Sequence, residues 1–362
     1  MRNTCHALAF FALAFWLGAA AQENSPEPTP KPSKLFEADA TLAISLHGPW
    51  RRILRDVTDP QRYDGSLEFT DTAGQRQTIS VQIGTRGLTR LEQVCDFPPL
   101  KLWFDKQQRK GTAFRGQGSL KMVTHCFTSK RYESYYVKEF LGYRIYNLIS
   151  PYSFRVRALE VTYHDSERDA RPFTRFAFLI EDIDDVAKRN DLVKLEVPEI
   201  HYTRLHPAQT SNYMLYQYLI GNLDWSVLSS RDPEECCHNT KLVGSDTGTG
   251  SIYPVPYDLD STGLVDAHYA GPPDNLPVRD IRQRLFRGFC LHNSEVPPAI
   301  ERYLAQRNDI VALFQNEPRL DNRTRGDTLR YIEDFYRVLR RSDAAERLTR
   351  TCRGRAPAAA AD

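Results

Sequence analysis

The sequence predicts an α+β protein with two lobes, a strand-rich N-terminal lobe over residues 35–182 and a helical C-terminal lobe over residues 183–350. In the first half, short segments alternate apolar and polar residues, which is the period of half-buried strands. In the second half, apolar residues recur at helical spacing, and Thr210 or Ser211 can cap the first of these runs. With 362 residues, 41% of them hydrophobic, the chain can bury one large core or two moderate ones.

The first 21 residues are typical of an export signal. Arg2 precedes the apolar run ALAFFALAFWLGAAAQ, which ends in small residues and is too short for a convincing membrane span. An uncleaved anchor is the alternative. The Pro-rich stretch 22–34 predicts an extended linker, and residues 351–362 predict a disordered tail. We therefore expect a secreted or periplasmic protein with no stable membrane span after cleavage.

The cysteines predict disulfide bonds. Cleavage removes Cys5 and leaves an even number of cysteines in an oxidising compartment. The sequence leaves their pairing open, although a bond between Cys95 and Cys126 would link two segments of the first half. Zinc is the alternative at the ECCHN segment, 235–239, but adjacent cysteines lack the spacing that closes a tetrahedral site.

The elements follow from the same patterns. Strands are expected, from their alternation and their β-branched or aromatic content, over 41–46, 66–71, 77–86, 99–105, 119–126, 154–165 and 173–182. The first five of these segments predict an antiparallel sheet. A helix is expected over about 130–149, where Tyr136, Phe140 and Tyr143 recur at helical spacing and Pro151 stops the run. Further helices are expected over 210–223, 296–315 and 325–348.

Carboxylate and amide side chains mark the loops of the second half. Asp224 lies in GNLDWS and Asn239 in CHNTKL, while Asp258 and Asp260 end the apolar, proline-framed segment YPVPYDLD. Magnesium takes few protein oxygens and completes its octahedron with water and phosphate. An Asp, then an Asn, then an Asp at a strand end is the order in which kinases supply a catalytic base and two magnesium ligands. We therefore expect Asp224, Asn239 and Asp258 to converge.

A basic and an acidic residue are expected to pair in the first half. Lys121 lies on the strand segment before the predicted helix, and Glu139 lies within that helix. In kinases a strand lysine paired with a helix glutamate holds the α- and β-phosphates. Lys101, on the preceding strand segment, competes for the same role, and either lysine taken alone is a solvent-facing strand charge. We expect one of the two lysines to approach Glu139.

The stretch from about 80 to 265 resembles the CotH kinase family, atypical protein-kinase-like proteins first associated with bacterial spore coats. TRGLTRLEQVCDFPPLKLWFD is similar to that family's Arg-Gly segment and lysine-bearing strand. RALEVTYHD and FTRFAFLIEDIDD are similar to its strand pair running into a glutamate. GNLDWSVLSS, HNTKLV and PVPYDLDSTG are similar to its catalytic and metal-binding loops. The resemblance implies a two-lobed, protein-kinase-like fold.

The resemblance also implies roles for the polar loop residues. Asp224 accepts or orients the proton of the hydroxyl group that is phosphorylated. Asn239 and Asp258 ligate Mg²⁺, and Asp260 assists them. A cation at this place would offset the unfavourable free energy of carboxylates at an apolar strand end.

The same resemblance implies a nucleotide site for ATP. Lys101 or Lys121 holds the phosphates, and Glu139 orients the lysine. The segment 180–184, which contains Glu181, joins the two lobes and offers backbone groups to adenine.

The sequence therefore predicts an exported kinase that uses ATP and Mg²⁺ to phosphorylate a hydroxyl group, with a protein as the expected substrate. One alternative is a catalytically silent protein of the same fold that acts in binding or envelope assembly. The other is a different metal-dependent phosphoester enzyme that uses Asp258 and Asp260. Nucleic acid is an unlikely partner by composition, because 48 Lys and Arg face 46 Asp and Glu, for a formal charge of +2, without a basic stripe.

Overall fold

The computed structural model describes residues 31–59, 61–87, 90–230, 236–245 and 247–354. The predicted export signal lies outside these residues, as do most of the predicted linker and the end of the predicted tail. None of the helices within the described ranges is long and apolar enough to cross a membrane.

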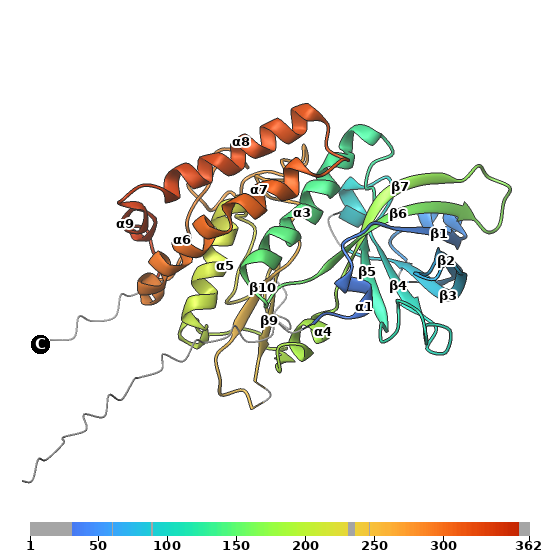
Figure 1. Ribbon diagram of the computed structural model, residues 1–362, viewed down its shortest axis with the longest axis horizontal. Coiled ribbons are helices and arrows are strands. Elements are labelled where there is room, and N and C mark those ends of the chain that lie inside the picture. Colours follow the sequence, from blue (N-terminus) through green and yellow to red (C-terminus); the bar gives the residue numbers. More distant parts are fainter. Residues whose placement is uncertain (1–30, 60, 88–89, 231–235, 246, 355–362) are drawn as a thin grey trace, which may run out of the picture.

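Seven strands close into a barrel at one end of the molecule, in the order β1-β2-β3-β4-β5-β7-β6 (Figure 1). Their bounds are β1 (Leu42–Gly48), β2 (Tyr63–Thr70), β3 (Arg76–Thr85), β4 (Leu100–Phe104), β5 (Ser119–Val123), β6 (Val156–Asp165) and β7 (Phe173–Ile180). All neighbouring strands are antiparallel except β1 and β6, which are parallel, with Leu42 opposite Leu159. This parallel pair joins the first strand to a late one and closes the sheet.

Side chains fill the interior of the barrel. Along β3, Ile79, Val81 and Ile83 are buried and alternate with more exposed residues, as the period of a strand requires. Phe114 is fully buried, with its ring centroid 5.2 Å from that of Phe69 and 5.0 Å from that of Phe104. The interior of the barrel is thus a packed core.

Helices cover one end of the barrel (Figure 1). The longer ones are α3 (Glu133–Ile149), α5 (Pro207–Ile220), α6 (Val296–Ala305), α7 (Arg307–Gln315) and α8 (Asn322–Leu339). The shorter ones are α1 (Lys34–Glu37), α2 (Trp50–Arg55), α4 (Ile183–Lys188), α9 (Ala344–Thr349), η1 (Arg90–Val94), η2 (Lys130–Tyr132), η3 (Tyr202–Arg204) and η4 (Cys290–Glu295). α3 lies between the barrel and the other helices, and Tyr136, Phe140 and Tyr143 on it are buried, as predicted.

A second, three-stranded sheet has the order β10-β9-β8. Its strands are β8 (Val193–Lys194), β9 (Thr240–Gly244) and β10 (Tyr253–Pro256). Pro254 and Pro256 fit β10 because this strand lies at the edge of the sheet, where a missing backbone N–H leaves no central ladder bond unmade. The acidic segment that begins at Asp258 follows this edge strand directly.

The predicted two-lobed kinase-like fold with a helical C-terminal lobe is wrong. The first half forms a closed mixed barrel, not an open antiparallel sheet, and the second half contains a sheet as well as helices. Alternation of apolar residues reports which face of a strand is buried, but it carries no information about which strand pairs with which. The parallel contact of β1 with β6 is therefore a feature that the pattern could not predict.

Three disulfide bonds join the described cysteines. The predicted Cys95–Cys126 bond is confirmed, with Cα atoms 4.5 Å apart. Cys290 pairs with Cys352, so part of the predicted tail is linked to η4, and the backbone N–H of Arg353 donates to Gly288. The adjacent Cys236 and Cys237 are bonded to each other.

Candidate functional site

Arg90 joins acidic residues from distant parts of the chain. It begins η1, a single π-helical turn that is followed at once by Cys95 and its disulfide to Cys126. Its Nη2 lies 2.7 Å from Glu139 Oε2 of α3, and its Nε lies 2.7 Å from Asp260 Oδ2. The Arg90 side chain is only 11% exposed and Glu139 is buried, so both ion pairs are shielded from solvent. The sequence predicted a strand lysine as the partner of Glu139, but the partner in the structure is Arg90.

Asp258 is the acid that this network leaves unbonded. Its Oδ1 lies 4.0 Å from Arg90 Nη2, and none of the described residues donates a hydrogen bond to its carboxylate. Its backbone has a φ of 55°, a left-handed conformation that is uncommon for a residue other than glycine and is found at functional sites. The backbone N–H of Asp258 donates to Tyr143 Oη at 3.0 Å, which holds this conformation in place.

The two neighbouring carboxyls have opposite pKa shifts. Burial by the surrounding protein raises the pKa of Asp258, and the negative charge of Asp260 adds to this effect. The Asp258 side chain is nevertheless 45% exposed, because it opens on a cavity, and this opening limits the effect of burial. Burial also acts on Asp260, but the Arg90 charge and the hydrogen bonds from Arg90 and Tyr269 outweigh it and lower the pKa of Asp260.

Asp224 is oriented by two partners from the segment before β9. His238 Nε2 lies 2.7 Å from Asp224 Oδ1, and Asn239 Nδ2 donates to the Asp224 carbonyl at 2.7 Å and to its Oδ2 at 3.1 Å. Asn239 has a φ of 49°, so it shares the left-handed conformation of Asp258. The disulfide between Cys236 and Cys237 directly precedes His238, and both sulfur-bearing residues are buried. None of the described residues donates a hydrogen bond to the Asn239 amide oxygen.

One cavity, of about 580 Å³, brings these groups together. Five of the residues predicted for the site line it: Glu139, Asp224, Asn239, Asp258 and Asp260. Arg86, Arg90 and His238 line it too, so four carboxylates face two arginines and one histidine. The expected convergence of Asp224, Asn239 and Asp258 is what the structure shows.

Neither of the two predicted lysines lines the cavity. Lys101 and Lys121 are opposite each other on β4 and β5, and Lys121 Nζ lies 4.4 Å from the centre of the Tyr257 ring. Tyr257 lines the cavity, and its hydroxyl accepts a hydrogen bond from Arg86. Burial lowers the pKa of Lys121 to about 8, and the charges of Arg86 and Lys241 act in the same direction. Burial, followed by the Lys121 charge, also lowers the pKa of Lys101.

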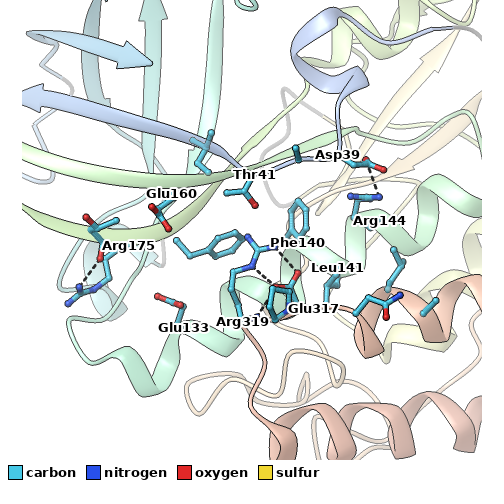
Figure 2. A pocket seen from close by; sticks show the side chains of 18 of the residues that line it. Asp39, Thr41, Glu133, Phe140, Leu141, Arg144, Glu160, Arg175, Glu317 and Arg319 are labelled. Atoms are coloured by element: carbon cyan, nitrogen blue, oxygen red, sulfur yellow. Dashed lines mark hydrogen bonds and ion pairs between the residues drawn. The ribbon is translucent and has the colours of Figure 1, made fainter. Parts of the chain in front are cut away.

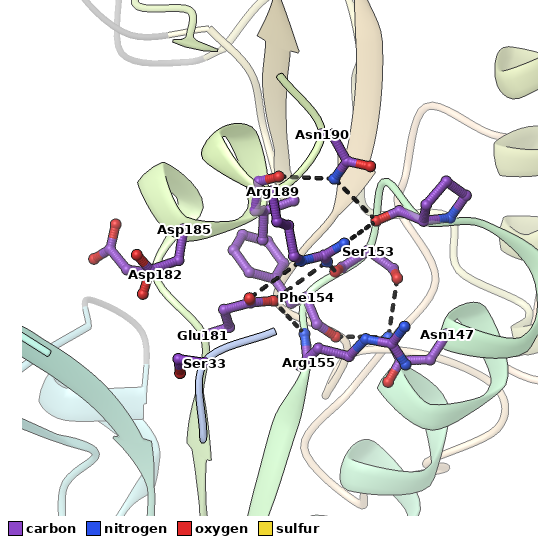
Figure 3. A network of polar contacts seen from close by, with 12 residues as sticks. Ser33, Asn147, Ser153, Phe154, Arg155, Glu181, Asp182, Asp185, Arg189 and Asn190 are labelled. Atoms are coloured by element: carbon purple, nitrogen blue, oxygen red, sulfur yellow. Dashed lines mark hydrogen bonds and ion pairs between the residues drawn. The ribbon is translucent and has the colours of Figure 1, made fainter. Parts of the chain in front are cut away.

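Glu181 belongs to a separate polar network (Figure 3). Its carboxylate accepts from Arg189 Nε at 3.2 Å and from the Arg155 backbone N–H at 2.9 Å. Arg189 also donates to the Pro151 carbonyl at 2.7 Å, so the network ties α4 to the segment before β6. Burial raises the pKa of Glu181, and the Arg189 charge opposes that shift. The side chain of Glu181 is thus used for structure and does not line the cavity of Asp258.

A larger cavity, of about 1130 Å³, lies between α3, β6, β7 and the segment after α7 (Figure 2). Two ion pairs lie in its lining. Arg144 lies 3.1 Å from Asp39, and Arg319 Nη2 donates to Glu317 at 2.7 Å. The Arg319 guanidinium also lies 4.4 Å from the centre of the Phe176 ring. Lys130, Glu133, Glu160 and Asp309 also line this cavity, and none of them forms an ion pair with another described residue. The cavity is larger, but none of the residues predicted for the site lines it.

Sequence reasoning missed Arg86, Arg90, His238, Tyr257 and Tyr269. Arg86 and Arg90 stand in TRGLTR, whose resemblance to the Arg-Gly segment implies no role for either arginine. The sequence around His238 suggests only the zinc alternative. The signal that could have found it is its place next to Asn239, since a histidine beside a site residue has a short path to the same cavity.

The comparisons with known proteins add no family: no family model matches this chain, and no curated protein matches it. The resemblance to the CotH kinase family stays a prediction. Among the described residues, no group of three or more His, Cys, Asp or Glu side chains could hold a metal ion. Magnesium bound through one carboxylate, one amide oxygen, water and phosphate needs no such group.

Proposed function

We propose that the cavity lined by Asp258 binds Mg²⁺ together with a nucleoside triphosphate, and that the protein transfers a phosphoryl group to a hydroxyl of a second substrate. The observation that carries the proposal is the state of Asp258: a carboxylate that no described side chain hydrogen-bonds, open to a cavity with more carboxylates than cationic groups. Such an excess of negative charge is offset when a divalent cation binds.

The donor set fits magnesium. Asp258 supplies a carboxylate oxygen, and Asn239 supplies its amide oxygen while its nitrogen is bonded to Asp224. Both are hard oxygen ligands of the kind that Mg²⁺ combines with water and substrate phosphate. Asp260 is bonded to Arg90 and Tyr269, so its support for the site is to position Arg90. This also disfavours a metal site built on Asp258 and Asp260 as an equal pair.

The remaining residues have roles in orientation and charge. When bound, the cation would neutralise charge on the transferred phosphoryl group. Arg86 lines the cavity and is the donor placed to contact phosphate oxygens, with Lys121 adding positive charge behind Tyr257. As the hydroxyl oxygen bonds to phosphorus and the bond to the leaving phosphate breaks, Asp224 accepts the hydroxyl proton. His238 holds Asp224 in position for that step.

We place this reaction outside the cytoplasm, on a protein substrate. The three disulfide bonds are compatible with an oxidising compartment, and the apolar N-terminal run supports export. A catalytically silent binding protein would use the same cavity without turnover, so binding and turnover have to be measured separately.

The test is calorimetric titration of a non-hydrolysable ATP analogue, with and without Mg²⁺, on the oxidised protein. We expect saturable binding that requires Mg²⁺. Asp258→Asn should weaken it about tenfold or more, because a charge-assisted contact is lost. Asp169→Asn is the matched control, since Asp169 is exposed and has the same charge. Binding that is independent of Mg²⁺, or unchanged in Asp258→Asn, contradicts the proposal.

Turnover distinguishes an enzyme from a silent binding protein. Asp224→Asn should keep the affinity for the Mg²⁺–nucleotide complex and lower the rate of phosphoryl transfer, because Asp224 acts on the hydroxyl. Binding without any transfer in the parent protein would support the silent alternative.

A further inference from the structure

A second cavity, of about 730 Å³, lies beside α3 and is lined mainly by residues of α3 and α8. Lys138 is one of its lining residues and is only 6% exposed. Lys138 directly precedes Glu139 in the helix, and successive helical residues point about 100° apart. Two neighbouring residues of α3 therefore face two different cavities, and Lys138 has no part in the site of Asp258.

The acids of this second cavity are all engaged by arginines. Each of its carboxylates has a partner, in the pairs Asp266–Arg282 and Asp334–Arg337 at 2.8 Å, Glu333–Arg307 at 2.8 Å, and Asp327–Arg330. Lys138 has no partner of this kind. Among the described residues, none forms a hydrogen bond or an ion pair with its Nζ, and the contact that remains is the Tyr135 ring, whose centre is 5.6 Å away.

An ammonium group at the end of a mostly buried side chain is unfavourable when it has no ion-pair partner. Burial lowers the pKa of Lys138 to about 8, while the charges of Asp266 and Asp327 oppose that shift and the charge of Arg282 adds to it. The amine still carries its proton at neutral pH. A bound anion would provide the counter-charge that the surrounding protein does not.

Other free donors lie along the same helical face. Ser134 is one turn before Lys138, and its hydroxyl has no hydrogen-bond partner among the described residues. Arg131, one further turn back, is exposed and contacts the ring and hydroxyl of Tyr132, and no described carboxylate pairs with it. Arg131 of η2 and Ser134 and Lys138 of α3 thus stand at the spacing i, i+3 and i+7, and the two positive charges among them form no ion pair with a described residue.

We propose that this second cavity binds a phosphate-bearing small molecule, with Lys138 and Ser134 as donors inside the cavity and Arg131 at its edge. A phosphate dianion matches the two unbalanced positive charges, and its several oxygens can accept from all three donors, whereas a carboxylate carries one charge and lies in a plane. The site is separate from the proposed nucleotide site, so this proposal does not depend on the proposed function.

The experiment is titration of inorganic phosphate in a chloride buffer that contains a chelator, at pH 7 and constant ionic strength. We expect saturable binding to the parent. Lys138→Met, of similar size and without charge, should weaken it about tenfold or more. Lys106→Met, which removes an exposed lysine, should bind phosphate like the parent. No saturable binding to the parent, or binding to Lys138→Met within about twofold of the parent, would overturn the proposal.

A second measurement on the unmodified chain covers the case in which Lys138→Met does not fold. Acetic anhydride at pH 8 acetylates amines that have lost their proton, and peptide mass spectrometry reports the rate at each lysine. We expect phosphate to slow acetylation of Lys138 about threefold or more while leaving Lys106 unchanged. Equal rates at Lys138 with and without phosphate would overturn the proposal as well.

Discussion

Arg90 binds two of the acids of the candidate site and leaves a third without a hydrogen bond. Its guanidinium is shared by Glu139 and Asp260, each at 2.7 Å, and this leaves Asp258 at 4.0 Å with its carboxylate open to the cavity. A fixed fork of donors explains why arginine suits this place, because a lysine ammonium is a point charge that holds two separate carboxylates less well. The free acid and the bonded acids thus result from the same side chain.

At this scale we expect Asp258→Asn to be as stable as the parent or more stable when metal is absent. The folded-state pKa of Asp258 is raised, so its ionisation lowers stability as the pH rises above the unfolded pKa, and an amide avoids that loss. Thermal unfolding at pH 7 in a chelator measures the effect. A marked fall in Tm would show that the Asp258 charge stabilises the fold without a cation.

Arg90→Met should have the opposite effect and destabilise the protein by about 3–5 kcal/mol at pH 7, because it leaves Glu139 and Asp260 buried without a partner. The loss should be smaller at pH 5. Without the guanidinium both folded-state pKa values rise above the unfolded values, so protonation relieves the variant as the pH falls. Urea unfolding at the two pH values measures this, with Arg115→Met, at an exposed arginine, as control. A loss that grows towards pH 5 would contradict the mechanism.

Among the elements, α3 and η1 position the candidate site. α3 is buried along most of its length and presents Glu139 and Tyr143 to the Asp258 cavity and Lys138 to the second cavity. η1 carries Arg90 and ends beside Cys95, so the Cys95–Cys126 disulfide connects the arginine-bearing turn to the segment after β5. The bond therefore constrains the turn that carries Arg90 as well as the unfolded chain.

We expect replacement of Cys95 and Cys126 by serine to lower both stability and affinity for the Mg²⁺–nucleotide complex. The sequence separation of 31 residues corresponds to about 3–4 kcal/mol of chain entropy. The matched control is the Cys290–Cys352 pair, whose larger separation of 62 residues implies an equal or larger loss of stability. That control should keep its affinity, because neither cysteine lines the cavity. Equal losses of affinity in both double variants would show a general effect of destabilisation.

On the scale of the whole molecule, the candidate site lies where the barrel meets the rest of the chain. Arg86 directly follows β3, and Ile180 ends β7, whereas Asp224 follows α5 and Asp258 follows β10. A ligand that contacts residues from both parts binds only the folded protein, since unfolding separates them. The cavity thus links ligand binding to the cooperative stability of the barrel and its helices.

Mg²⁺ and the ATP analogue together should therefore raise the Tm of the parent. Either one alone should give a smaller increase in Tm. At a ligand concentration of 100 times Kd the expected gain is about 2.7 kcal/mol. The gain should vanish with a chelator and be largely absent in Asp258→Asn. A gain of equal size in Asp258→Asn would place the ligand outside this cavity.

Local order was predictable from the sequence because it depends on neighbours in the chain. The alternation around Ile79, Val81 and Ile83 located β3, and the spacing of Tyr136 and Phe140 located α3. Asp258 was predictable for the same reason, because its place at the end of an apolar strand can be read from its neighbours in the chain. A carboxylate at such a place needs a counter-charge, which made it a candidate site residue.

The partners themselves were decided by tertiary structure. Whether β1 pairs with β6, and whether Glu139 meets Lys121 or Arg90, depends on which distant segments come within a few ångströms of each other. The pattern of apolar and charged residues does not specify which distant segments come close together, because burial of a strand face is equally favourable against several partners. Local patterns in the sequence predicted the seven barrel strands, the central helix and the acids of the candidate site, but not β8 or β9. Long-range packing decided the closed barrel, the cation that joins those acids, and the unpaired Lys138.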